Sequence, residues 1–93
     1  MLRITHVQAR NHGTLLLRLS NGQQVERDVR PLLTGPAFTQ LAASPQAFAA
    51  CDAEFGTVVW TDGADLCPDV LIWGGPARDA DMAPESVDLA VAV

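Results

Sequence analysis

Four carboxylates around one predicted hairpin come closest to a chemical site. Glu54, Asp62, Asp65 and Asp69 lie near one another in the sequence, and carboxylate oxygens are the ligands that hard divalent cations prefer. Asp62 also suits a turn, Asp69 suits a helix start, and Asp65 can accept backbone N–H bonds beside a tight hairpin. Because the spacing matches no known calcium-binding loop, we expect structural roles and no metal. A ligand site at this acidic corner is the alternative.

The nucleophilic and basic side chains form no catalytic pattern. Ser20 falls in a turn, Ser44 precedes a proline and Ser86 lies in a linker-like stretch, so none occupies a strand-to-helix elbow. His6 and His12 have no orienting aspartate nearby in the sequence, and we expect them to be surface or hydrogen-bonded structural residues. The sequence therefore predicts a protein that is not an enzyme, with no catalytic residues and no cofactor.

Hydropathy and the number of cysteines indicate the cellular compartment in which the protein is expected. No apolar run approaches the roughly 20 residues of a membrane helix, and the N-terminus lacks a signal-peptide core. We therefore expect a cytoplasmic protein that does not bind a membrane. Cys51 and Cys67 would then be reduced, and two cysteines do not make a zinc knuckle. Buried, inert thiols are expected at both positions.

Charge is distributed unevenly along the 93 residues. Residues 1–47 carry five arginines against two carboxylates, a balance of +3, whereas residues 48–93 carry one arginine against nine carboxylates, a balance of −8. An acidic chain without a cationic cluster is a poor independent nucleic-acid binder, since phosphate neutralisation supplies most of that affinity. A basic protein partner suits the acidic half better.

The arginines of the first half have a structural interpretation. Arg3, Arg18 and Arg27 are expected on the sheet surface, paired across strands with Glu26 or Asp28. A nucleic-acid stripe would need aromatic side chains interleaved with the arginines, and the first third of the chain contains none.

Alternation predicts strands at the N-terminus. Residues 2–9 alternate polar and apolar side chains and predict a first strand. Val7 has the opposite parity to Leu2 and Ile4, so we expect a bulge or a sharp twist near His6. An Asn-His-Gly turn follows this strand.

The next hairpin, between strands 14–19 and 23–29, has a turn whose length is set by burial. A two-residue Asn-Gly loop would place two carboxylates of the second strand beside buried leucines. A three-residue Ser-Asn-Gly loop instead places Val25 opposite Leu17. We therefore predict a type I turn with Gly22 in the left-handed conformation, followed by a G1 bulge.

The middle of the chain predicts helix and then strands. Pro36 suits a first helical position, and Phe38 and Leu41 begin one short amphipathic helix, with a further helical turn that buries Phe48. A short strand over residues 51–55 and a second strand over 57–60, with β-branched residues and an aromatic, follow. The remaining elements are a tight type I′ turn at Asp62-Gly63, a returning strand over 64–67 and a last helical turn from Pro68.

The tail differs in composition. Residues 76–86 are rich in Ala, Asp and Pro and predict a flexible linker, and residues 87–93 alternate like a strand. Such a strand can pair with a sheet edge of its own chain or of a partner. The residues expected to contact a partner are therefore Trp73, Val87, Leu89, Val91 and Val93.

These elements predict a small α+β domain over residues 1–75, with a linker and tail over 76–93. The sheet is antiparallel, with about five strands from two hairpin units, and one short helix packs on one face. Ten large side chains are expected to form most of the core: Leu15, Leu17, Leu19, Phe38, Leu41, Phe48, Phe55, Val58, Trp60 and Leu71.

A family resemblance rests on the second hairpin. Residues 54–60, Glu-Phe-Gly-Thr-Val-Val-Trp, are followed by Asp-Gly-Ala-Asp-Leu at 62–66 and Pro-Asp-Val-Leu at 68–71. This pattern resembles the bacterial family called domain of unknown function 2442, over residues 2–73. The resemblance implies a small α+β domain and a regulatory or antitoxin-like partner protein, and it implies no catalytic residues. Residues 76–93 lie outside the family pattern.

Three functions follow as hypotheses. The first is a non-catalytic protein-interaction or regulatory domain, such as the antitoxin-like member of a toxin-antitoxin-type operon, with a basic toxin-like partner. The second is a small-molecule or divalent-cation-binding domain that uses the acidic corner. The third is a self-associating structural domain, a homo-oligomer in which the tail pairs with a neighbouring copy.

Overall fold

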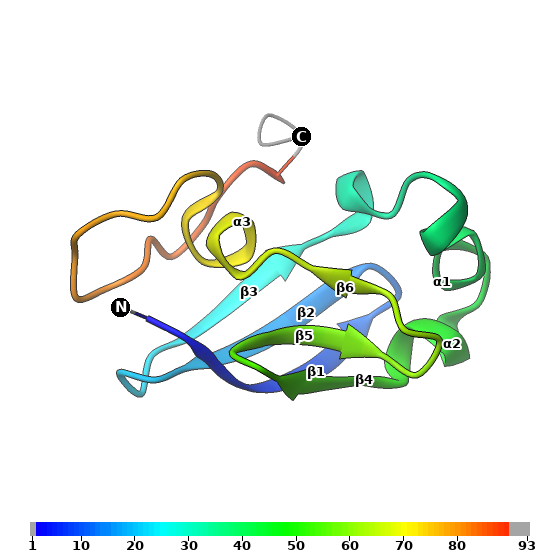
Figure 1. Ribbon diagram of the computed structural model, residues 1–93, viewed down its shortest axis with the longest axis horizontal. Helices are drawn as coiled ribbons and strands as arrows, with labels where there is room; N and C mark the ends of the chain where they lie inside the picture. The colour runs from blue at the N-terminus through cyan, green and yellow to red at the C-terminus, as the bar shows by residue number, and fades with distance from the viewer. Residues whose placement is uncertain (1, 90–93) are drawn as a thin grey trace.

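The computed structural model describes residues 2–89, which form six strands and a few short helices (Figure 1). The strands are β1 (Ile4–Asn11), β2 (Thr14–Leu19), β3 (Gln24–Asp28), β4 (Cys51–Glu54), β5 (Thr57–Trp60) and β6 (Asp65–Leu66). The helices are the 3-10 turns η1 (Arg30–Leu32) and η2 (Pro36–Phe38), and α1 (Thr39–Ala43), α2 (Pro45–Ala49) and α3 (Pro68–Trp73). The predicted α+β class is confirmed, with two three-stranded antiparallel sheets, β1-β2-β3 and β4-β5-β6.

The first sheet has the predicted register. Leu17 lies opposite Val25, the amide of Leu19 donates to the carbonyl of Gln23 at 2.8 Å, and Gly22 has φ 89°. These contacts define the predicted three-residue turn with its G1 bulge. The predicted irregularity in β1 is also present, because the pairing with β2 shifts between Ile4 and His6.

The second sheet has one three-residue turn and one two-residue turn. The two-residue type I′ turn was predicted between β5 and β6 but lies between β4 and β5. The amide of Trp60 donates to the carbonyl of Ala64 at 2.8 Å, and Gly63 has φ 92° while Asp62 is not left-handed. This is again a three-residue turn with a G1 bulge, so the type I′ turn predicted at Asp62-Gly63 is wrong. The two-residue type I′ turn lies instead between β4 and β5, where Phe55 has φ 54° and Gly56 has φ 78°.

The two sheets meet along β1 and β4, which lie side by side. The amide of Ile4 donates to the carbonyl of Gly56 at 3.1 Å, so the β4–β5 turn is tied to the start of β1. Figure 1 places α1 and α2 together at one end of the molecule and α3 at the other. Ser44 separates α1 from α2 and caps α2 by accepting from the amide of Ala47, so the predicted short helix and the further helical turn that buries Phe48 are both present. None of the helices within residues 2–89 has the length and apolarity of a membrane span.

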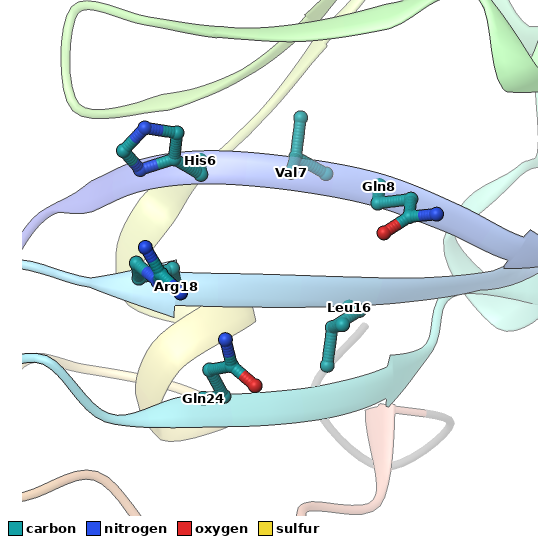
Figure 2. Close-up of a pocket in the computed structure, with 6 residues that line it drawn as sticks. All are labelled: His6, Val7, Gln8, Leu16, Arg18 and Gln24. Carbon is teal, nitrogen blue, oxygen red and sulfur yellow. The ribbon is translucent and has the colours of Figure 1, made fainter.

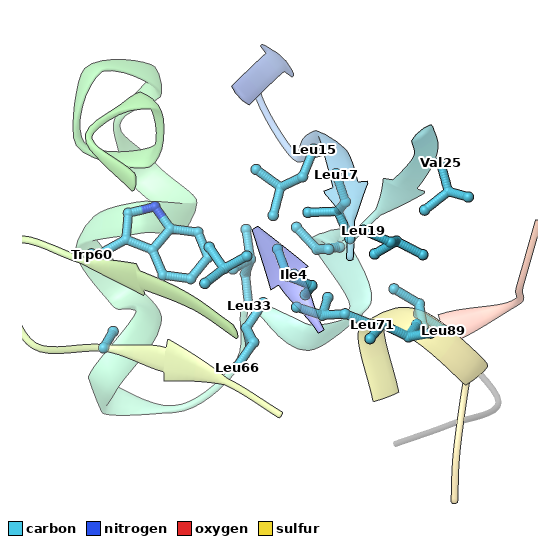
Figure 3. Packing of buried hydrophobic residues seen from close by; sticks show 14 of the residues in the cluster. Ile4, Leu15, Leu17, Leu19, Val25, Leu33, Trp60, Leu66, Leu71 and Leu89 are labelled. Carbon is cyan, nitrogen blue, oxygen red and sulfur yellow. The ribbon is translucent and has the colours of Figure 1, made fainter. Parts of the chain in front are cut away.

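The core fills the space between the sheets and α3 (Figure 3). The inward residues of β2 are almost completely buried, and Phe48 packs against Trp60 with ring centroids 5.9 Å apart. The indole Nε1 of Trp60 donates to the carbonyl of Phe48 at 2.7 Å, as expected for a buried tryptophan. Phe55, which we predicted in the core, is 90% exposed because the turn carries it outward. Phe38 is only half-buried.

The segment after α3 returns to the domain. Residues 76–82 are exposed and irregular, whereas Ala83 and Leu89 are buried in the core. We call residues 78–89 the C-terminal arm. Val87 and Asp88 are not in a strand, so the strand predicted over residues 87–93 is not formed there, and residues 90–93 lie outside the described residues. Figure 1 shows the arm leaving α3 and turning back past it.

Replacing Trp60 with phenylalanine tests the link between α2 and β5. Trp60→Phe leaves the buried carbonyl of Phe48 without its donor and opens space in the core, so we expect a loss of roughly 2–4 kcal/mol in the free energy of unfolding. Urea unfolding followed by far-UV circular dichroism measures this loss. A loss below about 0.5 kcal/mol, the range of neutral surface changes, would contradict the assigned hydrogen bond.

Candidate functional site

The four carboxylates of the predicted acidic corner do not come together. Within residues 2–89 no group of three or more His, Cys, Asp or Glu side chains is placed to hold a metal ion. Asp62 closes its turn by accepting from the amide of Ala64 at 3.0 Å, and Asp69 lies in the first turn of α3. Asp65 is exposed on β6, and Glu54 is exposed at the end of β4. These four side chains are not grouped within residues 2–89, so the alternative of a divalent-cation corner has no geometric support.

The predicted partner-contact residues fall into two groups. Trp73 is 4% exposed and Leu89 is 2% exposed, so both are covered by the chain itself, and Val87 is half-buried against Gly74. A contact made by Trp73 or Leu89 would require the core to open. Val91 and Val93 lie outside the described residues.

A shallow hollow of about 400 Å³ lies on the outer face of the first sheet (Figure 2). It is lined by His6, Val7, Gln8, Leu16, Arg18 and Gln24, from all three strands. His6 contacts the hydroxyl of Thr5 at 3.2 Å, and both the imidazole and the Arg18 side chain are exposed. The polar groups here are solvated rather than convergent, so this face lacks the enclosed geometry that a catalytic or small-molecule site needs.

The β4–β5 turn presents an aromatic side chain to solvent. Phe55 is one of the two exposed large apolar side chains in residues 2–89, the other being Met82. A bulky residue at positive φ is unusual, because its Cβ crowds the backbone, and the first position of a type I′ turn normally holds Asn, Asp or Gly. The backbone conformation of Phe55 therefore costs about 1–2 kcal/mol that an asparagine would largely avoid.

The surroundings of Phe55 are ordered. A Cβ added at Gly56 would lie 3.0 Å from the Nε of Arg3, so the Arg3 side chain covers the turn. The main chain of Arg3 is itself held by Ser20, whose amide donates to the Arg3 carbonyl at 2.8 Å. A hollow of about 490 Å³ adjoins the turn and is lined by Leu2, Arg3, Phe55, Gly56, Pro68 and Asp69. Phe55 thus projects from a fixed support beside a concave surface.

A second unusual residue is Arg27, which is 1% exposed on the inward face of β3. Its guanidinium donates to five main-chain carbonyls: those of Leu71 (2.6 Å), Ile72 (3.1 Å), Pro84 (2.8 Å), Glu85 (2.9 Å) and Glu26 (3.0 Å). Two of these acceptors are in the last turn of α3, where carbonyls have no partner within the helix. Two others belong to the C-terminal arm.

Within the described residues, main-chain dipoles rather than a carboxylate surround the guanidinium. Within residues 2–89 no carboxylate lies within salt-bridge distance of Arg27; Glu26 pairs with Arg10 at 3.8 Å and Asp28 with Arg30 at 2.6 Å. Burial lowers the pKa of Arg27 from its ordinary value, yet arginine remains charged in proteins. The expected surface pairing of Arg27 with Glu26 or Asp28 is therefore wrong.

Arg27 could have been placed from the sequence. The register that puts Val25 opposite Leu17 also puts Arg27 opposite Leu15, on the buried face. The alternation of β3 therefore indicated that Arg27 is buried. The prediction placed it on the surface because arginine is usually exposed.

The other reactive side chains have structural surroundings. His12 contacts the carbonyl of Leu41 at 2.9 Å through Nε2 and packs edge-on against Phe48, as expected for a structural histidine. Cys51 is half-buried, and burial raises the pKa of its thiol. Cys67 is exposed, so its predicted burial is wrong.

Substitution of Arg27 tests its role in joining β3, α3 and the arm. Arg27→Lys keeps the charge but offers a single nitrogen to carbonyls that now meet three, so several buried acceptors lose their donor. We expect a loss of roughly 3 kcal/mol or more in the free energy of unfolding, measured by urea denaturation. Arg18→Lys, on the exposed face of β2, is the matched control and should change the stability by less than about 0.5 kcal/mol. Equal effects of the two changes would refute the role.

The two thiols should differ in reactivity. The thiolate is the reacting species, so the raised pKa and partial burial of Cys51 slow its reaction, whereas Cys67 is accessible. With Ellman's reagent at pH 8, we expect one fast and one slow phase in the native protein. Cys67→Ser should remove the fast phase and Cys51→Ser the slow one, and the reverse assignment would contradict the structure.

Comparison with known proteins gives a family. The family model described as "Protein of unknown function (DUF2442)" matches residues 4–77, which include both sheets and α3 but not the C-terminal arm. Searches among curated proteins and among solved structures find no matching relative. Because the family model covers most of the chain, the resemblance drawn from the second hairpin is confirmed, and this protein belongs to the DUF2442 family.

Proposed function

We propose that this domain is a non-catalytic protein-binding module, the antitoxin-like or regulatory member of a bacterial operon. The surface we assign to binding is the Phe55 tip, meaning Phe55 with the adjoining hollow lined by Leu2, Arg3, Pro68 and Asp69. The partner we expect is a basic protein with an apolar pocket that accepts the phenylalanine ring.

One observation carries the proposal: a 90% exposed phenylalanine occupies a left-handed position at a hairpin tip. Folding gains nothing from this choice, because the ring is not buried and the backbone is strained. Strain of this kind concentrates at functional positions, and aromatic side chains in rigid settings are enriched at the centres of protein interfaces.

The charge around the tip favours a basic partner. Asp52 and Glu54 are exposed on β4, and Asp69 borders the hollow. Arg3 is the cation near them, and its side chain lies over Gly56. Acidic groups around an apolar anchor accelerate the association of a cationic protein and disfavour acidic competitors.

Replacing Phe55 with asparagine separates binding from folding. Phe55→Asn suits the left-handed position, so we expect the melting temperature to rise by a few degrees, since about 1 kcal/mol corresponds to roughly 4–8 °C in a domain of this size. The same change should abolish recovery of a stoichiometric partner in a pull-down from the native host, because it removes the aromatic anchor. Differential scanning calorimetry measures the melting temperature, and quantitative mass spectrometry of the pull-down measures the recovered partner.

Met82→Gln is the matched control, since Met82 is the other exposed large apolar side chain and lies on the arm. It should leave both the partner and the melting temperature unchanged. The proposal is refuted if no stoichiometric partner is recovered with the natural chain, or if Phe55→Asn retains the partner in full.

A further inference from the structure

The C-terminal arm is held in the manner of a bound peptide. Within residues 2–89, five hydrogen bonds link a domain side chain to a main-chain atom of the arm. Asn21 donates to the carbonyl of Asp81 (2.8 Å), and Arg27 donates to those of Pro84 (2.8 Å) and Glu85 (2.9 Å). Gln23 makes the other two, donating to the carbonyl of Ala83 at 2.7 Å and accepting from its amide at 2.9 Å.

The clearest similarity to peptide recognition lies in the contacts of Gln23 with Ala83. Its side-chain amide binds both the N–H and the C=O of Ala83, which is how a neighbouring strand pairs with one residue of an extended chain. Recognition through the main chain fixes the direction and register of a segment while requiring little of its sequence.

Apolar side chains supply the remaining contacts. Ala83 is 6% exposed and Leu89 is 2% exposed, and Figure 3 shows Leu89 beside Leu71 of α3. Val87 packs on Gly74, where an added Cβ would lie 3.0 Å from the Val87 Cβ. Pockets for a small residue and for aliphatic residues four and six positions later would set the preferred sequence of an occupant.

The arm also lies outside the part of the chain that the family model matches. The match ends at residue 77, before the arm begins. Residues 76–82, which include the first residues of the arm and join its buried part to α3, are exposed and have no helix or strand. Exposed irregular connections of this kind permit a segment to leave its own domain and enter that of a neighbouring copy.

We infer that the surface formed by Asn21, Gln23, Arg27 and α3 is a peptide-binding groove, occupied in the monomer by the arm of the same chain. The occupant we assign in trans is the arm of a second copy of this chain, which carries the same small and aliphatic residues at the same spacing. Two copies that exchange arms satisfy the same contacts twice and form a closed two-fold dimer.

Cleavage of the connection tests the groove. The recognition sequence of a site-specific protease is inserted between Arg78 and Asp79, both exposed, in the full chain. After cleavage, the arm should remain bound through size-exclusion chromatography, and a fluorescent peptide of residues 79–93 should replace it with a rise in anisotropy. Gln23→Ala should weaken peptide binding about tenfold or more, since it removes both hydrogen bonds to Ala83. Gln24→Ala, which changes the neighbouring amide on the outer face, should leave the affinity unchanged.

The uncut chain tests whether the arm of a second copy enters the groove. Light scattering should show a dimer fraction that rises with concentration, and the free peptide should suppress it by competing for the groove. A chain that remains monomeric at millimolar concentration would exclude arm exchange. Loss of the arm on cleavage without peptide rebinding, or unfolding of the cleaved domain, would overturn the groove itself. Neither result bears on the Phe55 tip, so the two proposals fail separately.

Discussion

The burial of one guanidinium constrains much of this structure. Arg27 points into the domain because β3 alternates, and a buried arginine must find acceptors for its five N–H groups. The acceptors are main-chain carbonyls in β3, at the end of α3 and in the C-terminal arm. These carbonyls need donors as much as Arg27 needs acceptors, so the arrangement satisfies the helix end and the arm together. Strand, helix and arm are thereby held in one relative position.

The two candidate binding surfaces are physically connected through Arg3. Its main chain pairs with Ser20 in the β2–β3 turn, next to Asn21 and Gln23 of the groove, while its side chain lies over Gly56 beneath the Phe55 tip. Each surface departs from what folding alone favours. One exposes an aromatic ring on a strained backbone, and the other uses polar side chains to hold a segment that the family match does not cover. Departures of this kind are typical of functional sites.

The acidic residues that suggested a ligand site do not form one in the folded domain within residues 2–89. Glu54, Asp62, Asp65 and Asp69 are close in the sequence, yet a turn, a strand and a helix point them to different places. Trp73 and Leu89, expected to be contacts for a partner, instead complete the core. What remains on the surface is an exposed phenylalanine, a bound arm and solvated charges, and these features are the support for the proposed binding module.

Local rules were sufficient for much of the fold. The α+β class, the bulge near His6, the Leu17–Val25 register and the turn at Gly22 all follow from alternation, turn chemistry and the cost of burying carboxylates, which act between near neighbours. The sequence by itself determined these features. The acceptors of Arg27 in α3 and in the arm lie 44 to 58 positions away, and the turn that exposes Phe55 is tied to β1 by Ile4. Only the tertiary structure decided where those residues lie, because their partners are set by packing between distant segments rather than by any periodicity along the chain.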